Sequence, residues 1–96
     1  MIYMSYTIDP QAFKNAERIG VEIKKSTQKN KKLDVFKDGV KVATIGDTRY
    51  NDYRSYIKRD GKAFADERRR LYKIRHEKTR KEKGTPSYYA DKILWD

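Results

Sequence analysis

Hydrophobic residues between positions 33 and 45 follow the two-residue period of β-strands, and the pattern is interrupted once, at Asp38-Gly39. An Asp-Gly pair between two such runs is typical of a type I′ hairpin, because both turn positions favour a positive φ. A two-residue turn would pair Lys37 with Val40. In that register one face of the hairpin carries Leu33, Val35, Val40 and Val42, and the other carries Phe36, Ala43 and Ile45. We therefore expect the hairpin to pack on one side and to be partly covered on the other.

The residues before the hairpin predict a helix followed by a strand. Asp9-Pro10 is a helix start, because Asp can cap and Pro suits the first helical position, and Gly20 is a helix end. Phe13 and Ala16 would face inward on this helix. The alternation over residues 21–23 predicts a strand that could complete a three-stranded antiparallel meander.

Three further helices are expected after the hairpin. Asn51 can cap a short helix that ends at Gly61, and a long basic helix follows over residues 62–83. Gly84-Thr85-Pro86 predicts a stop, and Ser87 can cap a last helix over residues 88–95. The predicted fold is α+β, with a short antiparallel meander or hairpin packed against one long basic helix and smaller aromatic-rich helices.

Composition indicates one small domain with a thin core over residues 1–96. An N-terminal arm and short helix would occupy residues 1–20, the meander residues 21–46 and the helical part residues 47–96. Charged residues make up 40% of the chain and hydrophobic ones 36%, so the twelve aromatic side chains must supply much of the buried area. Burial of Trp95 would close the core, and deletion of the last eight residues should unfold the domain.

Several classes of protein are disfavoured by what the chain lacks. Without cysteine it can form neither disulfides nor cysteine-based zinc sites. No apolar run approaches the ~18 residues of a membrane span, and residues 1–10 lack the basic and apolar regions of a signal peptide. We therefore expect a protein that is not secreted and does not span a membrane.

Positive charge is concentrated in the second half of the chain. Residues 1–48 hold nine Lys or Arg against six Asp or Glu, giving +3, whereas residues 49–96 hold fifteen against eight, giving +7. The same half contains eight of the twelve aromatic residues. Basic residues interleaved with aromatic ones suit a polyanionic partner, because phosphates pair with cations and bases stack on rings. Acidic protein surfaces are the other class of partner.

Helical geometry divides the basic segment 66–84 into three groups. Successive residues are turned by roughly 100°, so three adjacent arginines point in three directions. Arg68 and Arg75 share a stripe with Phe64, Leu71 and Tyr72. The two arginines either stack over the core or emerge at the edge of a binding surface. The opposite face offers i,i+4 pairs, and pairing thins out after Lys78. The predicted pairs are Asp66–Arg70, Lys73–Glu77 and Glu77–Lys81.

Two sets of residues are therefore candidates for contact with a partner. The residues expected to contact phosphates or an acidic partner are Lys58, Arg59, Lys62, Arg68, Arg75, Lys78, Arg80, Lys81 and Lys83. The residues that could stack on bases are Tyr50, Tyr53 and Tyr56, although their spacing of three also suits packing of one helical face into the core.

Nothing in the chain indicates catalysis. His76 is the single histidine, and no second histidine or cysteine accompanies it, so we expect a hydrogen-bonded structural histidine. The phosphate-binding loop, zinc-protease and nucleophile-elbow motifs are all absent. We expect no enzyme, no cofactor, no metal and no small-molecule substrate.

An ordered string of residues between positions 33 and 95 resembles a family of small basic proteins of unknown activity from large DNA viruses of algae and amoebae. The matching residues are Ile45-Gly46-Asp47, Asp52-Tyr53, Tyr56, Gly61-Lys62, Ala65, Arg69-Arg70, Tyr72, Arg75-His76-Glu77, Tyr88-Tyr89-Ala90-Asp91 and Leu94-Trp95. The family has Gly-Ser-x-Gly before the paired tyrosines, where this chain has Gly84-Thr85-Pro86-Ser87. The resemblance implies a viral protein located in the virion or in the viral factory of the host cytoplasm.

These observations lead to one leading function and two alternatives. The leading expectation is contact with nucleic-acid phosphates, DNA being favoured, in packaging or organising a viral genome. The first alternative is a minor capsid or cement protein that bridges acidic surfaces of capsid proteins. The second is a regulatory factor that acts on a host protein.

Overall fold

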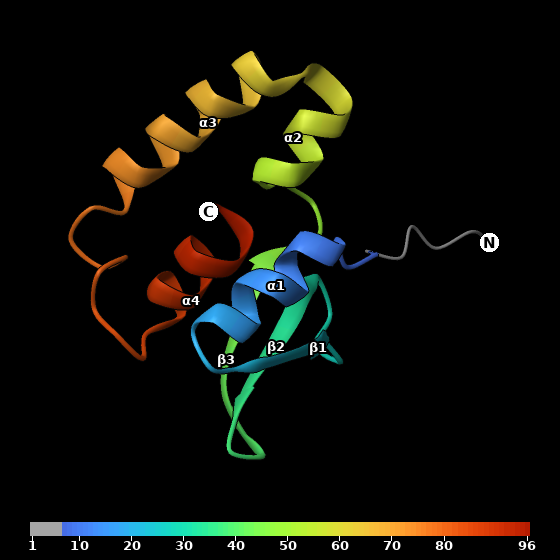
Figure 1. Cartoon of the computed structure of the whole chain (residues 1–96), viewed down its shortest axis with the longest axis vertical. Helices are drawn as coiled ribbons and strands as arrows, with labels where there is room; N and C mark the ends of the chain where they lie inside the picture. The colour runs from blue at the N-terminus through green and yellow to red at the C-terminus, as the bar shows by residue number, and fades with distance from the viewer. Residues whose placement is uncertain (1–6) are drawn as a thin grey trace.

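The computed structural model describes residues 7–96 and contains a three-stranded antiparallel sheet with the strand order β1-β2-β3 (Figure 1). The strands are β1 (Glu22–Lys25), β2 (Lys31–Lys37) and β3 (Val40–Asp47), and the helices are α1 (Pro10–Arg18), α2 (Tyr53–Asp60), α3 (Lys62–Arg75) and α4 (Pro86–Leu94). The predicted α+β class and the meander are confirmed. Residues 1–6 lie outside the described residues. They belong to the predicted N-terminal arm and to the segment that lacks the features of a signal peptide.

A β-bulge decides which residues of the hairpin are buried. The turn is as predicted, with positive φ at Asp38 and Gly39 and with Lys37 paired to Val40. The register then shifts, so that Val35 pairs with Ala43 and Val42 is the extra residue. One inserted residue reverses the alternation beyond it. The predicted faces were therefore wrong: Leu33, Val35, Ala43 and Ile45 are buried, whereas Val40 and Val42 are exposed.

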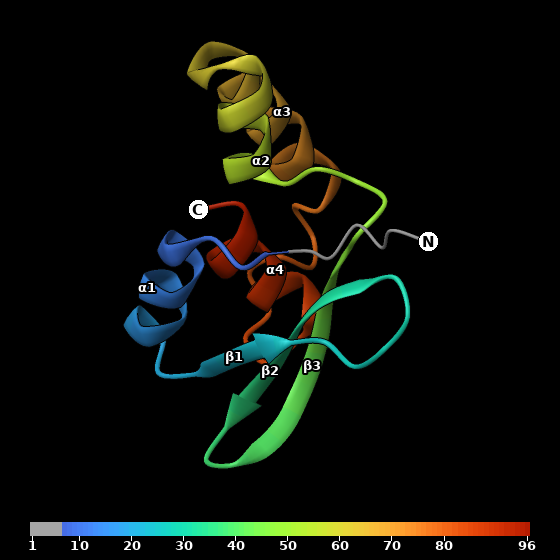
Figure 2. The same ribbon diagram turned by 90° about the vertical axis from the view of Figure 1, so that its right-hand side faces the viewer.

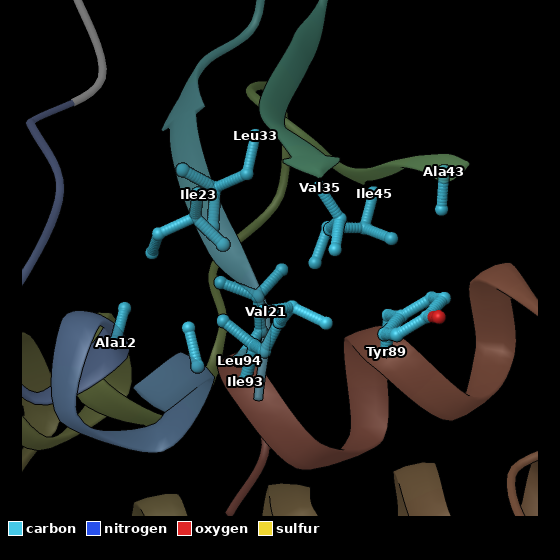
Figure 3. Packing of buried hydrophobic residues seen from close by; sticks show 11 residues of the cluster. Ala12, Val21, Ile23, Leu33, Val35, Ala43, Ile45, Tyr89, Ile93 and Leu94 are labelled. Carbon is cyan, nitrogen blue, oxygen red and sulfur yellow. The ribbon is translucent and has the colours of Figure 1, made fainter. Parts of the chain in front are cut away.

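Helices α1 and α4 cover the buried face of the sheet. Figure 3 shows side chains of α4 pointing towards those of the strands, with Ala12 of α1 at the side. The core cluster includes Val21, Ile23, Leu33, Val35, Ile45, Tyr89, Ile93 and Leu94. Ala16 faces inward as predicted, but Phe13 is half exposed, and Asn15 is buried instead. The amide of Asn15 donates to the backbone oxygen of Ile93 at 3.1 Å, which links α1 to α4.

Helices α2 and α3 form a hairpin that lies over α4 and away from the sheet (Figures 1 and 2). Asp52, and not the predicted Asn51, caps α2 by accepting the backbone N–H of Ser55 at 3.1 Å. Gly61 connects the two helices with a φ of 91°, in the region that glycine adopts without strain. None of the helices within residues 7–96 combines the length and the apolar character needed to cross a membrane.

Helix α3 ends at Arg75, so the predicted helix over residues 62–83 is too long at its C-terminal end. Residues 76–84 form turns that lead into α4. A helix continued to Lys83 would reach about 12 Å further along its axis, whereas the turns bring Arg80 back to Asp91 of α4. Thr85 caps α4 and Pro86 occupies its first turn, so Gly84-Thr85-Pro86 starts a helix, and the predicted cap at Ser87 was wrong.

Asp91 is the buried anchor between α4 and the segment that precedes it. Its side chain is fully buried and lies 3.3 Å from the Nζ of Lys73, 3.7 Å from Arg80 and 3.8 Å from Lys92. A buried carboxylate requires such compensation, because an isolated charge in the interior is strongly unfavourable. Asp91 therefore holds α3 and the following turns against α4.

Candidate functional site

A cleft of about 590 Å³ opens between the α2–α3 hairpin on one side and α4 with the end of β3 on the other. We call it the central cleft. It is lined by residues as far apart in sequence as Lys32 and Trp95. It therefore exists only because the helical hairpin folds back over α4.

Aromatic rings form much of the wall of the central cleft. Trp95, at the C-terminal end of α4, stacks on Tyr72 with a centroid distance of 4.3 Å and an interplanar angle of 7°. Tyr56 lies 6.2 Å from Trp95, and His76 lies 4.4 Å from Tyr72. Trp95 is only partly buried, so it joins α4 to α3 and still contributes surface to the cleft.

Arg68 and Arg75 both line the central cleft from α3. They are seven positions apart on the helix, or about 10 Å along its axis. The guanidinium of Arg68 lies 5.5 Å from the ring centroid of Tyr56, a cation–π contact. Within residues 7–96, neither arginine has a carboxylate within 4.0 Å, although most cations on α3 do. Arg68 therefore stacks on a tyrosine, which is one of the two predicted alternatives, and it also borders a cleft.

The other charged groups of the cleft are neutralised locally. Asp52 accepts from the Nζ of Lys32 at 2.9 Å, and both side chains are buried. Asp47 pairs with Arg49 at 2.7 Å, and hydrogen bonds from Arg49 hold the pKa of Asp47 well below its usual range. Among the described residues that line the cleft, positive charge without a nearby counter-charge is therefore found at Arg68 and Arg75.

The pKa of His76 lies below its ordinary value. Burial lowers the pKa of its imidazole from 6.5, and the neighbouring Arg75 lowers it further, while Asp91 opposes both. The ring packs against Tyr72, and within the described residues its side chain makes no hydrogen bond, so the predicted hydrogen-bonded histidine was wrong in that respect. His76 therefore contributes a flat aromatic surface to the cleft.

The remaining predicted contact residues lie outside the cleft, and most are in ion pairs. The pairs are Lys58 with Asp9 at 3.0 Å, Arg59 with Asp60 at 3.8 Å, Lys62 with Asp66 at 2.9 Å, Arg80 with Glu77 at 2.9 Å and with Asp91, and Lys81 with Glu77 at 2.7 Å. Within residues 7–96, Lys78 and Lys83 are without a carboxylate at this distance, and both are exposed on the turns after α3.

The outer face of α3 is self-paired, but mostly not through the predicted partners. Arg70 pairs with Glu67 and not with Asp66, and Lys73 pairs with Asp91 and not with Glu77. The predicted pair Glu77–Lys81 is present. Spacing of three as well as four residues brings side chains together on a helix, and Asp91 is reached only through tertiary packing.

The three predicted stacking tyrosines occupy three different environments. Tyr53 is buried, donates its hydroxyl to Asp66 at 2.6 Å and lies 4.1 Å below the guanidinium of Arg69. Tyr56 lines the cleft beside Arg68, and Tyr50 lies at the cleft with 69% of its surface exposed. Tyr53 therefore joins α2 to α3, and only the other two have surface in the cleft.

Sequence reasoning missed Tyr72, Trp95 and Asn51 as parts of the site. Tyr72 was placed on the stripe with Arg68, and that stripe was the one available signal for a site on α3. Trp95 and Asn51 come from α4 and from the segment before α2, so no spacing along the chain connects them to α3.

Neither a metal-binding cluster nor similarity to a known protein indicates a function for this chain. Within residues 7–96, no three His, Asp or Glu side chains are grouped so that they could hold a metal ion. No protein-family model, curated protein or solved structure matches this chain. The geometry of the cleft is therefore the basis for assigning a function.

Proposed function

We propose that this chain binds nucleic acid through the central cleft and that it is a binding protein, not an enzyme. The observation that carries the proposal is the position of Arg68 and Arg75, two guanidiniums without an acidic partner in the described residues, beside the aromatic wall of one cleft. Guanidinium groups suit phosphates, and aromatic rings suit bases. The two chemistries occur together in nucleic acid.

The overall charge supports the same proposal. The chain carries a formal net charge of +10 at pH 7, and such an excess attracts a polyanion over long distances. The setting that we propose, packaging or organisation of a viral genome in the virion or viral factory, rests on the family resemblance of residues 33–95.

A capsid or cement role is the second candidate, and exposed apolar residues on α3 favour it. Phe64 is 49% exposed and Ile74 is 61% exposed on a helix that carries six Lys or Arg residues. Apolar side chains surrounded by cations suit an acidic protein surface better than a phosphate backbone. This candidate would bring Phe64 and Ile74 into contact with acidic capsid proteins, and it would leave the cleft empty.

The test is a comparison of two double variants in a salt series with labelled DNA. In Arg68→Gln/Arg75→Gln the two cleft arginines are removed, whereas Arg59→Gln/Arg70→Gln removes the same charge from ion-paired positions outside the cleft. We expect the log–log dependence of affinity on salt to become shallower by about 1.4–1.8 in the cleft variant, which corresponds to two lost phosphate contacts.

Two results would count against the proposal. Absence of binding to single-stranded and duplex DNA even at ~50 mM salt would remove nucleic acid as the partner. Equal salt dependence in the two double variants would mean that the cleft is not the site. Circular dichroism of both variants is the control that separates a change in binding from unfolding.

A further inference from the structure

The size of the central cleft restricts the form of nucleic acid that can enter it. About 590 Å³ is within the range of ~300–1,000 Å³ found for sites that enclose small organic ligands. One nucleotide fits such a volume. A double helix, whose major groove alone is about 12 Å wide, does not.

The aromatic surface in the cleft suits a base whose face is free. Trp95 is covered on one side by Tyr72, yet it remains partly exposed and lines the cleft, and Tyr50 is 69% exposed. In a duplex the faces of each base are covered by the neighbouring base pairs. Only an unpaired base can present a face to Trp95 or Tyr50.

A polar group is available for the edge of such a base. Asn51 lines the cleft and is partly buried, and within residues 7–96 its side-chain amide makes no hydrogen bond. An amide both donates and accepts, so it can pair with the edge of a base. Trp95, Tyr50 and Asn51 thus offer a stacking surface and an edge contact within one cleft.

The charges of α3 argue against contact with a duplex along the helix. A helix that lies against a duplex presents cations to the phosphates, but on α3 the outward cations Lys62 and Arg70 are already paired with carboxylates. Arg68 and Arg75, for which residues 7–96 offer no carboxylate within 4.0 Å, border the cleft and lie about 10 Å apart along the helix axis. Two cations at that separation could each pair with one phosphate of a strand that enters the cleft.

We infer that the ligand of the central cleft is single-stranded nucleic acid, with one unpaired base against Trp95 and Tyr50 and its flanking phosphates at Arg68 and Arg75. The inference rests on the proposed function and specifies the form of nucleic acid that this site binds. It also identifies Tyr50, which makes no ring contact within the described residues, as a residue whose surface is used by the ligand.

The chain contains its own reporter for this inference. Trp95 is the only tryptophan, so a base that stacks on it will quench the intrinsic fluorescence of the protein. The experiment titrates the full chain with three probes: a short oligothymidylate, the same strand annealed to its complement, and an oligonucleotide of equal length with abasic sites, which keeps the phosphates and lacks the bases.

We expect the single strand to quench Trp95 and to bind about tenfold more tightly than the abasic strand, in the range for one stacked base. Binding of the duplex should be weaker than that of the single strand and should leave the fluorescence unchanged. Tyr50→Ala should weaken binding of the single strand about tenfold. Phe13→Ala, which removes an exposed ring on α1 outside the cleft, should leave it unchanged.

The possible failures are distinguishable. Equal affinity for the three probes with unchanged Trp95 fluorescence would overturn the single-strand inference while the proposed function stands. Absence of binding to all three would overturn both.

Discussion

Three adjacent arginines on α3 show how strongly the position of a single residue decides its role. Arg68 lies at the cleft over Tyr56, Arg69 lies over the buried Tyr53, and Arg70 pairs with Glu67 on the surface. The three environments follow from the rotation of roughly 100° per residue in a helix. Adjacency in sequence therefore says little about shared function on this helix.

His76 provides a prediction at the residue scale, because its pKa in the folded protein is lower than 6.5. Below pH 6.5 the unfolded chain binds a proton that the folded protein resists, so the free energy of unfolding should decrease as the pH falls through this region. His76→Gln should remove this decrease, as measured by urea unfolding between pH 7.5 and pH 5. The carboxylates whose pKa values are lowered titrate further down.

The same histidine allows a second measurement of that prediction. Because His76 is the only histidine, its imidazole signals can be followed by NMR without assignment. Arg75→Gln removes a nearby positive charge and should raise the pKa of His76. An unchanged pKa would contradict the placement of Arg75 beside the ring.

At the scale of elements, the bulge in the β2–β3 hairpin makes neighbouring residues differ in their contribution to stability. Ile45 is almost completely buried, and Val42 is 38% exposed. Ile45→Ala should lower the free energy of unfolding by about 2–5 kcal/mol, and Val42→Ala by less than about 1 kcal/mol. Chemical denaturation of the two variants measures both. Without the bulge the order would be reversed.

The C-terminal end of α3 is determined by a tertiary contact and not by helix propensity. Residues 76–83 are rich in helix-forming Lys, Arg and Glu, yet they form turns. The turns bring Arg80, whose side chain is only 16% exposed, to the buried Asp91. A buried carboxylate gains more from a second cation than a surface segment gains from helix propensity, which is a few tenths of a kcal/mol per residue.

At the scale of the whole molecule, α4 holds the two parts of the protein together. Its buried face, with Tyr89, Ile93 and Leu94, packs on the sheet (Figure 3), and Trp95 and Asp91 contact α3 and the turns that follow it. Gly46 of β3 lies so close that an added Cβ would be 2.9 Å from Leu94. Both the core and the cleft therefore depend on this helix.

Deletion of residues 89–96 should unfold the protein, as expected from the sequence. The deletion removes Tyr89, Asp91, Ile93 and Leu94, and a sheet without a covering helix is marginal in water. Thermal denaturation followed by circular dichroism should then show no cooperative transition. Removal of Asp96 alone deletes one exposed ion pair with Arg18 and should change stability by less than ~0.5 kcal/mol. A cooperative transition in the longer deletion would contradict the role assigned to α4.

Much of the fold could be predicted because its signals are local. The Asp38-Gly39 turn, the Asp9-Pro10 helix start and the glycine between α2 and α3 depend on the conformational preferences of one or two residues. The predictions were wrong where distant contacts compete with such preferences, as at the bulge and at the end of α3. The prediction that Phe13 faces inward was wrong, because two faces of α1 carry apolar residues. The face with Ala12 and Ala16 is the one that packs against α4.

The α+β class, the meander and the separation of Arg68 and Arg75 from the outer face of α3 could be predicted, because each follows from short-range periodicity along the chain. That these two arginines share a cleft with Trp95, Tyr50 and Asn51 depends on the packing of the folded protein. Packing also decides which cations are paired with carboxylates. Asp9 pairs with Lys58, and Asp91 pairs with Lys73 and Arg80, across the fold. Charge and stacking act through space, and distance in space is set by packing and not by position along the chain.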